Sequence, residues 1–134
     1  MISKIDHVGI AVHSIAEASK FYQSLGLIIE AVEEVPAEGV KVAMMQCGES
    51  RIELLEATRE DSPIGRFLAR RGGGIHHICF ATSDVQGDQE SLADQGYRLL
   101  RPEPTQGAGG CWVQFVHPNS AGGVLVELSE KKPC

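Results

Sequence analysis

IDHVGIAVHSIAEASKFYQSLGLIIE, at residues 5–30, aligns without a gap on IHHICFATSDVQGDQESLADQGYRLL, at residues 75–100. The alignment places His7 on His77 and repeats the same order of apolar and polar residues. Self-similarity at a fixed offset is typical of a duplicated structural unit. The sequence therefore predicts two similar modules in tandem.

Each copy opens with a β-rich run of aliphatic and aromatic residues, Ile5–Val12 or Ile75–Thr82, which is typical of a strand. Ser14 and Asp84 follow as helix N-cap residues, and an amphipathic stretch comes after each of them. The predicted helices end at glycines, Gly26 and Gly96.

Three strand-like segments follow each helix, so each copy is predicted to be βαβββ and the fold class to be α+β. They are Leu27–Val35, Val40–Cys47 and Arg51–Glu56 in the first copy, and Arg98–Leu100, Trp112–Val116 and Val124–Leu128 in the second. Asp61-Ser62-Pro63 predicts the start of a helix that Gly72-Gly73-Gly74 ends. We expect one domain over 1–134, with module one at 1–57, the linking helix at 58–73 and module two at 74–131.

The composition is that of a folded protein that is not specialised for nucleic acid. Hydrophobic residues make up 43% of the 134 residues and charged residues 22%, and the formal charge of −6 disfavours a general nucleic-acid surface. No apolar run approaches the roughly 20 residues that cross a bilayer, and the N-terminus does not resemble a signal peptide. We expect a cytoplasmic protein that binds neither membranes nor nucleic acid.

Matched histidines and glutamates predict a metal site. His7 and His77 occupy the same place in the two opening strands, and Glu53 and Glu127 lie between aliphatic residues in the two closing strands. A carboxylate in such a strand is costly to bury unless something compensates its charge. One divalent cation bound by all four side chains would compensate both carboxylates, and nitrogen and oxygen ligands suit zinc, cobalt, nickel, manganese or iron.

Other polar residues are given structural roles. His76 competes with His77 as a ligand, but the repeat aligns it with Asp6, on the opposite strand face, so we expect it only to neighbour the site. His13 and His117 have no partner in the repeat. We expect a flexible loop beside the cavity at residues 106–110, and a solvated cluster of Arg66, Arg70 and Arg71, with phosphate contact as its alternative. Cys47, Cys79, Cys111 and Cys134 are expected to be small buried or surface thiols.

The two βαβββ copies and the opening DHVGIAV resemble the vicinal oxygen chelate superfamily, which includes glyoxalase I, dioxygenases and resistance proteins. Within it, GGGIHHICFAT, LLRPEPTQGAGG and FVHPNSAGGVLVELSE are similar to methylmalonyl-CoA epimerases. The resemblance implies a curved mixed sheet around a cavity, a homodimer, and an acyl-CoA thioester as substrate. It also implies that His7, Glu53, His77 and Glu127 are the metal ligands.

The implied reaction interconverts (R)- and (S)-methylmalonyl-CoA, a step that links propionyl-CoA to succinyl-CoA. The carbon between a thioester and a carboxylate must lose a proton and regain it on the other face, through an enolate that a divalent ion stabilises. Two acid/base groups would exchange the proton, and Glu127 is the candidate for one of them. Some relatives carry a glutamate where this chain has Val42, so Glu53, His76 or a water on the metal are the alternatives for the second group.

Two other functions stay open at this point. Glyoxalase I uses a similar set of two histidines and two glutamates and also passes through an enediolate. Small proteins of this fold class also sequester drugs without catalysis, although such a module has no need of four metal ligands.

Overall fold

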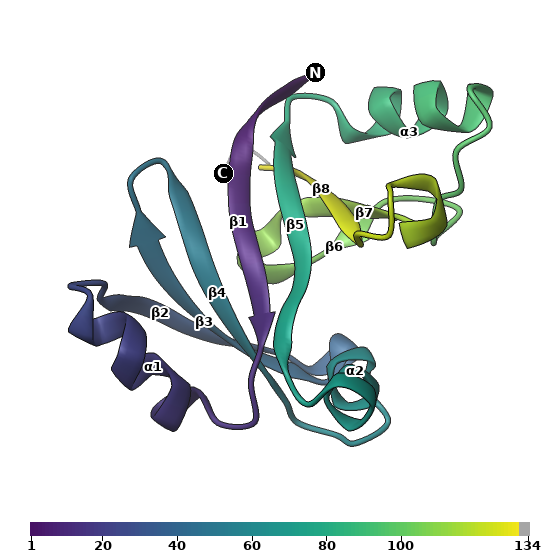
Figure 1. Ribbon diagram of the computed structural model, residues 1–134. Helices are drawn as coiled ribbons and strands as arrows, with labels where there is room; N and C mark the ends of the chain where they lie inside the picture. Colours follow the sequence, from purple (N-terminus) through teal and green to yellow (C-terminus); the bar gives the residue numbers. More distant parts are fainter. Residues whose placement is uncertain (132–134) are drawn as a thin grey trace. The chain divides into compact units, whose positions relative to one another are not determined.

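The computed structural model describes residues 1–131, and they form two compact units, each described here by itself. One unit is His7–His76, and the other joins residues 1–6 to the chain from His77 onward. Strand β1 (Ile2–Ala11), purple in Figure 1, gives its first half to the second of these units and its last half to the first.

The His7–His76 unit carries strands in the order β2-β3-β4-β1. β1 and β4 run parallel, whereas β2–β3 and β3–β4 are antiparallel pairs. Its elements after β1 are α1 (Ile15–Ser24), β2 (Ile29–Val35), a short 3-10 helix η1 (Pro36–Glu38), β3 (Val40–Cys47), β4 (Ser50–Ala57) and α2 (Pro63–Arg71).

The other unit repeats this plan, with strands in the order β1-β5-β8-β7-β6. β5 and β8 run parallel, as β1 and β4 do, and β7 is antiparallel to β8. Its elements are β5 (Gly74–Thr82), α3 (Val85–Asp94), β6 (Thr105–Gln106), η2 (Ala108–Gly110), β7 (Trp112–Val116), η3 (Pro118–Ser120) and β8 (Val126–Glu130). The prediction of two βαβββ copies in an α+β fold is confirmed, while the boundaries proposed for domain and modules stay a prediction.

Helices α1 and α3 begin and end where the sequence predicts. The Ser14 hydroxyl accepts a hydrogen bond from the Glu17 amide at 3.2 Å, and Asp84 accepts one from the Gly87 amide at 3.0 Å. Gly26, after α1, has φ +96°, a conformation that glycine adopts without steric cost. These caps satisfy backbone groups that have no partner inside the helix.

The linking helix is shorter than expected. It covers Pro63–Arg71, with Ser62 as N-cap and Gly72 in the left-handed conformation at its end, whereas the sequence suggested 58–73. Residues 58–61 form a bend and a turn that precede the cap. The start signal at Ser62-Pro63 is therefore confirmed, and the helix occupies only the part of the segment between its two end signals.

Two helices of the His7–His76 unit cover opposite faces of its strands. Neighbouring residues of a strand point to opposite faces. Leu55 belongs to a cluster with α2, and Leu54 to a cluster under α1. The α2 cluster is Ala11, Val40, Val42, Leu55, Ile64 and Phe67, and the α1 cluster is Ile15, Ala43, Met45 and Leu54.

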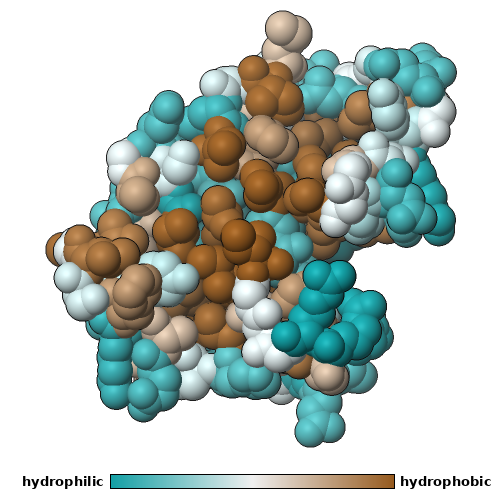
Figure 2. All heavy atoms as spheres, in the orientation of Figure 1, coloured by the Kyte–Doolittle hydropathy of each residue, from teal (hydrophilic) through white to brown (hydrophobic). Residues whose placement is uncertain are grey.

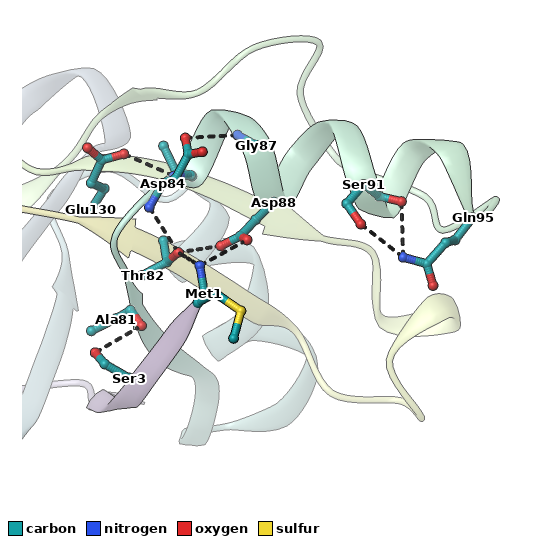
Figure 3. Close-up of polar contacts among 11 residues, drawn as sticks. Met1, Ser3, Ala81, Thr82, Asp84, Gly87, Asp88, Ser91, Gln95 and Glu130 are labelled. Atoms are coloured by element: carbon teal, nitrogen blue, oxygen red, sulfur yellow. Dashed lines mark hydrogen bonds and ion pairs between the residues drawn. The ribbon is translucent and has the colours of Figure 1, made fainter.

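The closing strand of each unit also binds the start of that unit's helix. Glu56, near the end of β4, accepts a hydrogen bond from the Ile15 amide at 2.7 Å. Glu130, at the end of β8, accepts one from the Val85 amide at 2.9 Å (Figure 3). A carboxylate at a helix N-terminus is favoured both by the free N–H groups and by the helix dipole. In each copy the closing strand is thus joined to the start of the helix by the same contact.

The space under α3 is open where the space under α1 is filled. A pocket of about 520 Å³ lies beside α3 and is lined by Leu92, Val116 and Leu128, among others. The strand register places Val116 opposite Val126, as Met45 lies opposite Ile52. Val116 therefore stands where the first copy has Met45, and the repeat sets Leu92 in the place of Tyr22. At both positions the second copy has the smaller side chain.

One predicted strand is wrong. Residues 98–100 form only an isolated bridge between Leu99 and Val116, and the strand that follows α3 is β6 at Thr105–Gln106. Residues 101–103 are bends, and no side chain in the segment 101–104 marks where pairing resumes. Strand pairing at this edge is decided by β7, to which β6 is antiparallel.

Among the residues that the structure describes, no helix is long and apolar enough to cross a membrane. Cys47 is an exposed thiol and Cys111 a half-buried one, the buried Cys79 thiol donates to Phe80 O at 3.8 Å, and Cys134 lies outside the described residues.

Candidate metal centre and active site

The first predicted ligand pair comes together inside the His7–His76 unit. His7 on β1 and Glu53 on β4 are both buried, with 5% and 3% of their surface exposed. Nδ1 of His7 lies 3.3 Å from Oε2 of Glu53. The parallel ladder explains the meeting, because Glu53 is level with Gly9, two residues along β1 from His7 and on the same strand face.

The second pair forms in the other unit in the same way. Nε2 of His77 on β5 lies 2.9 Å from Oε1 of Glu127 on β8, and both residues are buried. Phe115 of β7 meets the His77 ring edge to face, with the ring centroids 6.1 Å apart. Phe115 is also level with Glu127 in the ladder, so it packs beside the pair from the neighbouring strand.

The two pairs occupy equivalent register positions. Val8 is level with Ile52 in the first unit, and Ile78 is level with Val126 in the second. In each unit the histidine lies one residue before this level pair on its strand, and the glutamate lies one residue after it on the parallel strand. The two copies that are similar in sequence are therefore also paired in the same way between their strands.

The donor set of each pair fits a divalent metal ion. Ligands at roughly 2.0–2.2 Å from one ion are about 3.0–3.4 Å apart when they occupy neighbouring coordination positions. The separations of 3.3 Å for His7–Glu53 and 2.9 Å for His77–Glu127 are close to that spacing. Two buried carboxylates also supply the charge that a divalent ion would neutralise. That all four side chains share one ion stays a prediction.

Arg51 also contacts the first pair, which was not predicted from the sequence. Its guanidinium donates to Oε2 of Glu53 at 2.8 Å, the same oxygen that faces His7. Arg51 lies two residues before Glu53 on β4, hence on the same strand face, and is level with His7 in the ladder. The i, i+2 spacing in a strand was the available signal.

The other three histidines lie in different surroundings, and a role for His76 beside the metal site stays a prediction. The His76 ring meets Phe67 of α2 edge to face at 5.0 Å between centroids. Nδ1 of His117 accepts a hydrogen bond from the Asn119 amide at 3.0 Å, which caps η3, and His13 is exposed. None of these contacts involves a predicted ligand.

The arginine cluster lies on the surface of α2, and the glycine-rich segment spans a strand end and a 3-10 turn. Arg66, Arg70 and Arg71 of α2 are all exposed, and Arg71 lies over the Phe67 ring at 5.7 Å from its centroid. Residues 106–110 contain the end of β6 and the 3-10 turn η2. Whether this segment is flexible stays a prediction.

Val42 occupies the place where some relatives carry a glutamate. It is 3% exposed and packs in the α2 cluster with Ala11 and Leu55. Val42 is level with Leu55 on β4, and Leu55 lies on the same strand face as Glu53, two residues earlier. This position therefore supplies apolar packing and no proton carrier.

The chain matches the family model of the Glyoxalase/Bleomycin resistance protein/Dioxygenase superfamily over residues 6–115. An ethylmalonyl-CoA/methylmalonyl-CoA epimerase of Cereibacter sphaeroides is 39% identical over 97% of this chain and 99% of its own length. A Streptomyces coelicolor methylmalonyl-CoA epimerase variant, solved in complex with 2-nitronate-propionyl-CoA, superposes with a TM-score of 0.94. It is 39% identical and covers 98% of this chain and 96% of its own.

A further solved structure is described as methylmalonyl-CoA epimerase in complex with methylmalonyl-CoA and NH4+. It also has a TM-score of 0.94 and 39% identity, over 98% of this chain and 96% of that one. The resemblance drawn from the repeat and the closing segment is thus confirmed over nearly the whole length. The chain belongs to the Glyoxalase/Bleomycin resistance protein/Dioxygenase superfamily and, within it, to the methylmalonyl-CoA epimerase family.

Proposed function

We propose that the protein interconverts (R)- and (S)-methylmalonyl-CoA by removing the proton from the carbon between the thioester and the carboxylate and returning one to the other face. The observation that carries the proposal is the pair of buried His/Glu couples at matched ladder positions. Similarity over nearly the whole chain to a structure in complex with methylmalonyl-CoA supports the choice of substrate. The nitronate complex supports the type of intermediate, because a nitronate carries its negative charge on oxygen atoms as an enolate does.

We infer that His7, Glu53, His77 and Glu127 hold one divalent ion, with cobalt, zinc, nickel and manganese as the candidates. Each couple brings one nitrogen and one oxygen donor together at a spacing that suits adjacent ligands. A bound divalent ion would supply positive charge beside the oxygen atoms of the substrate when the proton leaves. The chain's own contribution is to fix the four donors on strands and to bury them away from water.

Glu127 is the proposed acid/base group. Its carboxylate is buried on β8, next to the His77 ring, and β7 and β5 flank it in the ladder. A general base must lie within hydrogen-bond reach of the proton that it takes, and a carboxylate held by two neighbouring strands has few ways to move out of that position. Glu53 and His76 stay the alternatives for the second group on the chain, since Val42 offers no titratable atom.

The test follows the α-proton of one methylmalonyl-CoA epimer in deuterium oxide by NMR, with protein before and after treatment with a chelator. We expect exchange together with epimerisation, lost after chelation and restored by a divalent ion. Exchange that survives complete metal removal contradicts the metal site but leaves the reaction. No exchange by metal-loaded protein contradicts the reaction, and activity on the glutathione hemithioacetal would then favour glyoxalase chemistry. Protein that binds no metal and turns over neither substrate would favour a sequestering module.

We also propose a homodimer in the cytoplasm. Exposed apolar side chains around the end of α1 support the dimer, because a contact with a second copy would bury them. Phe21, Leu25 and Ile28 are 62%, 64% and 70% exposed. Figure 2 shows apolar surface at the left edge of the view, over this end of the helix. Light scattering after size exclusion gives the mass in solution, and a monomer at micromolar concentration would contradict the dimer.

A further inference from the structure

Arg51 gives the first His/Glu couple a permanent positive charge. Its guanidinium donates to Oε2 of Glu53 at 2.8 Å, and the two side chains are 32% and 4% exposed. Nδ1 of His7 lies 3.3 Å from the same oxygen. A buried carboxylate needs a compensating partner, and arginine stays charged at every pH at which the protein is folded.

The second couple has no such charge at the equivalent position. Glu53 is matched by Glu127, so Arg51 is matched by Leu125. The ladder agrees with the sequence match, because Arg51 is level with His7 and the Ile78 amide donates to Leu125 O, one step along from His77. The two couples therefore occupy equivalent ladder positions, and Leu125 stands in the second where the first has Arg51.

We propose that Arg51 is an internal counter-cation that neutralises Glu53 when no metal is bound and that lowers the affinity of the site for a divalent ion. The inference rests on the proposed metal site. A metal ion at Glu53 must share the carboxylate with the Arg51 guanidinium, and these two positive charges repel each other. Arg51 thus stabilises the metal-free first couple more than the metal-loaded one, and by linkage a group with this preference weakens metal binding.

The direction of the effect separates this role from simple positioning. If Arg51 only held Glu53 in place for the ion, its removal would weaken metal binding. If it competes with the ion, its removal destabilises the metal-free protein, strengthens metal binding and leaves the metal-loaded protein close to wild type. Metal affinity and metal-free stability must therefore change in opposite senses.

The experiment compares Arg51→Leu, which copies the residue of the second couple, with Arg51→Lys and with Arg98→Leu. Arg98 is exposed and lies outside the site, so its variant controls for the loss of one positive charge from the surface. Dissociation constants for cobalt(II) and zinc(II) are measured by competition with a chromophoric chelator. Melting temperatures are measured with chelator present and with each ion in excess.

We expect Arg51→Leu to bind both ions about tenfold to a thousandfold more tightly, the upper figure being roughly the effect of one unit charge about 4 Å away at an effective dielectric of about 20. Its melting temperature should fall without metal and recover with metal. Arg51→Lys should remain close to wild type, and Arg98→Leu should change neither quantity. Should Arg51→Leu fail to fold without metal, Arg51→Gln removes the charge and keeps polar atoms at the same place.

Equal or weaker metal binding by the neutral Arg51 variants would overturn the counter-cation role while leaving the metal site intact. A wild-type protein that binds neither cobalt nor zinc would overturn the metal site itself and this inference with it. The two failures are therefore distinguished by the wild-type measurement alone.

Discussion

Nδ1 of His7 and Oε2 of Glu53 lie 3.3 Å apart, on two strands that a helix and two further strands separate in the chain. The second copy reproduces the couple, with Nε2 of His77 2.9 Å from Oε1 of Glu127. Each couple is made by one parallel strand pair, which needs the helix between its strands as a crossover. The βαβββ topology is therefore what brings each histidine to its glutamate.

His7→Ala and His77→Ala should both lose bound metal and epimerase activity while keeping the fold, because each removes one ligand and no ladder hydrogen bond. Metal content by mass spectrometry and secondary structure by circular dichroism check the two statements. His13→Ala is the matched control, since His13 is exposed. Stoichiometric metal in both variants would show that the ligands are assigned wrongly.

Glu127→Gln should lower the rate of α-proton exchange by about 10²- to 10⁴-fold, the usual contribution of a positioned acid/base group. The amide keeps an oxygen donor of similar size but cannot take up the proton. Metal content must be measured on the same sample. A variant that holds metal fully and still exchanges the proton at the wild-type rate would exclude Glu127 as the base.

Glu56→Ala and Glu130→Ala should each lower the free energy of unfolding by about 1 kcal/mol, because each leaves a helix N-terminus without its carboxylate. Figure 3 shows the second of these contacts, in which Glu130 reaches the start of α3. Urea denaturation measures the change. Glu90→Ala, at an exposed position of α3, is the control and should change stability by less than about 0.5 kcal/mol.

Leu92→Tyr combined with Val116→Met should raise the free energy of unfolding by about 1 kcal/mol, since both changes copy the first module and place apolar atoms in the pocket beside α3. Thermal unfolding checks the sign. Leu54→Ala makes the opposite change in the filled module, where the side chain is fully buried, and should cost about 2–5 kcal/mol. Lower stability of the filled variant would mean that the hollow under α3 cannot accept the larger side chains.

Local signals predicted the helices better than the edge strands. Ser14 and Asp84 begin α1 and α3, because an N-cap needs only its own side chain and the amides three residues on. The segment 98–100 has strand-like residues but makes only one bridge, since a strand exists only where a neighbour pairs with it. A sequence pattern contains the local information that sets a helix start, but it does not say which distant segment will pair with a strand.

The sequence by itself determined the duplication, the order of elements in each copy and the four residues proposed to bind metal, because a repeat and a period of two are visible along the chain. Only the tertiary structure decided the contacts of these residues. The distance between His7 and Glu53, the donation from Arg51 and the bond from Ile15 to Glu56 all depend on the register of β1 against β4. Register is set by hydrogen bonds between strands far apart in sequence, and a shift of one residue would turn these side chains to the other face.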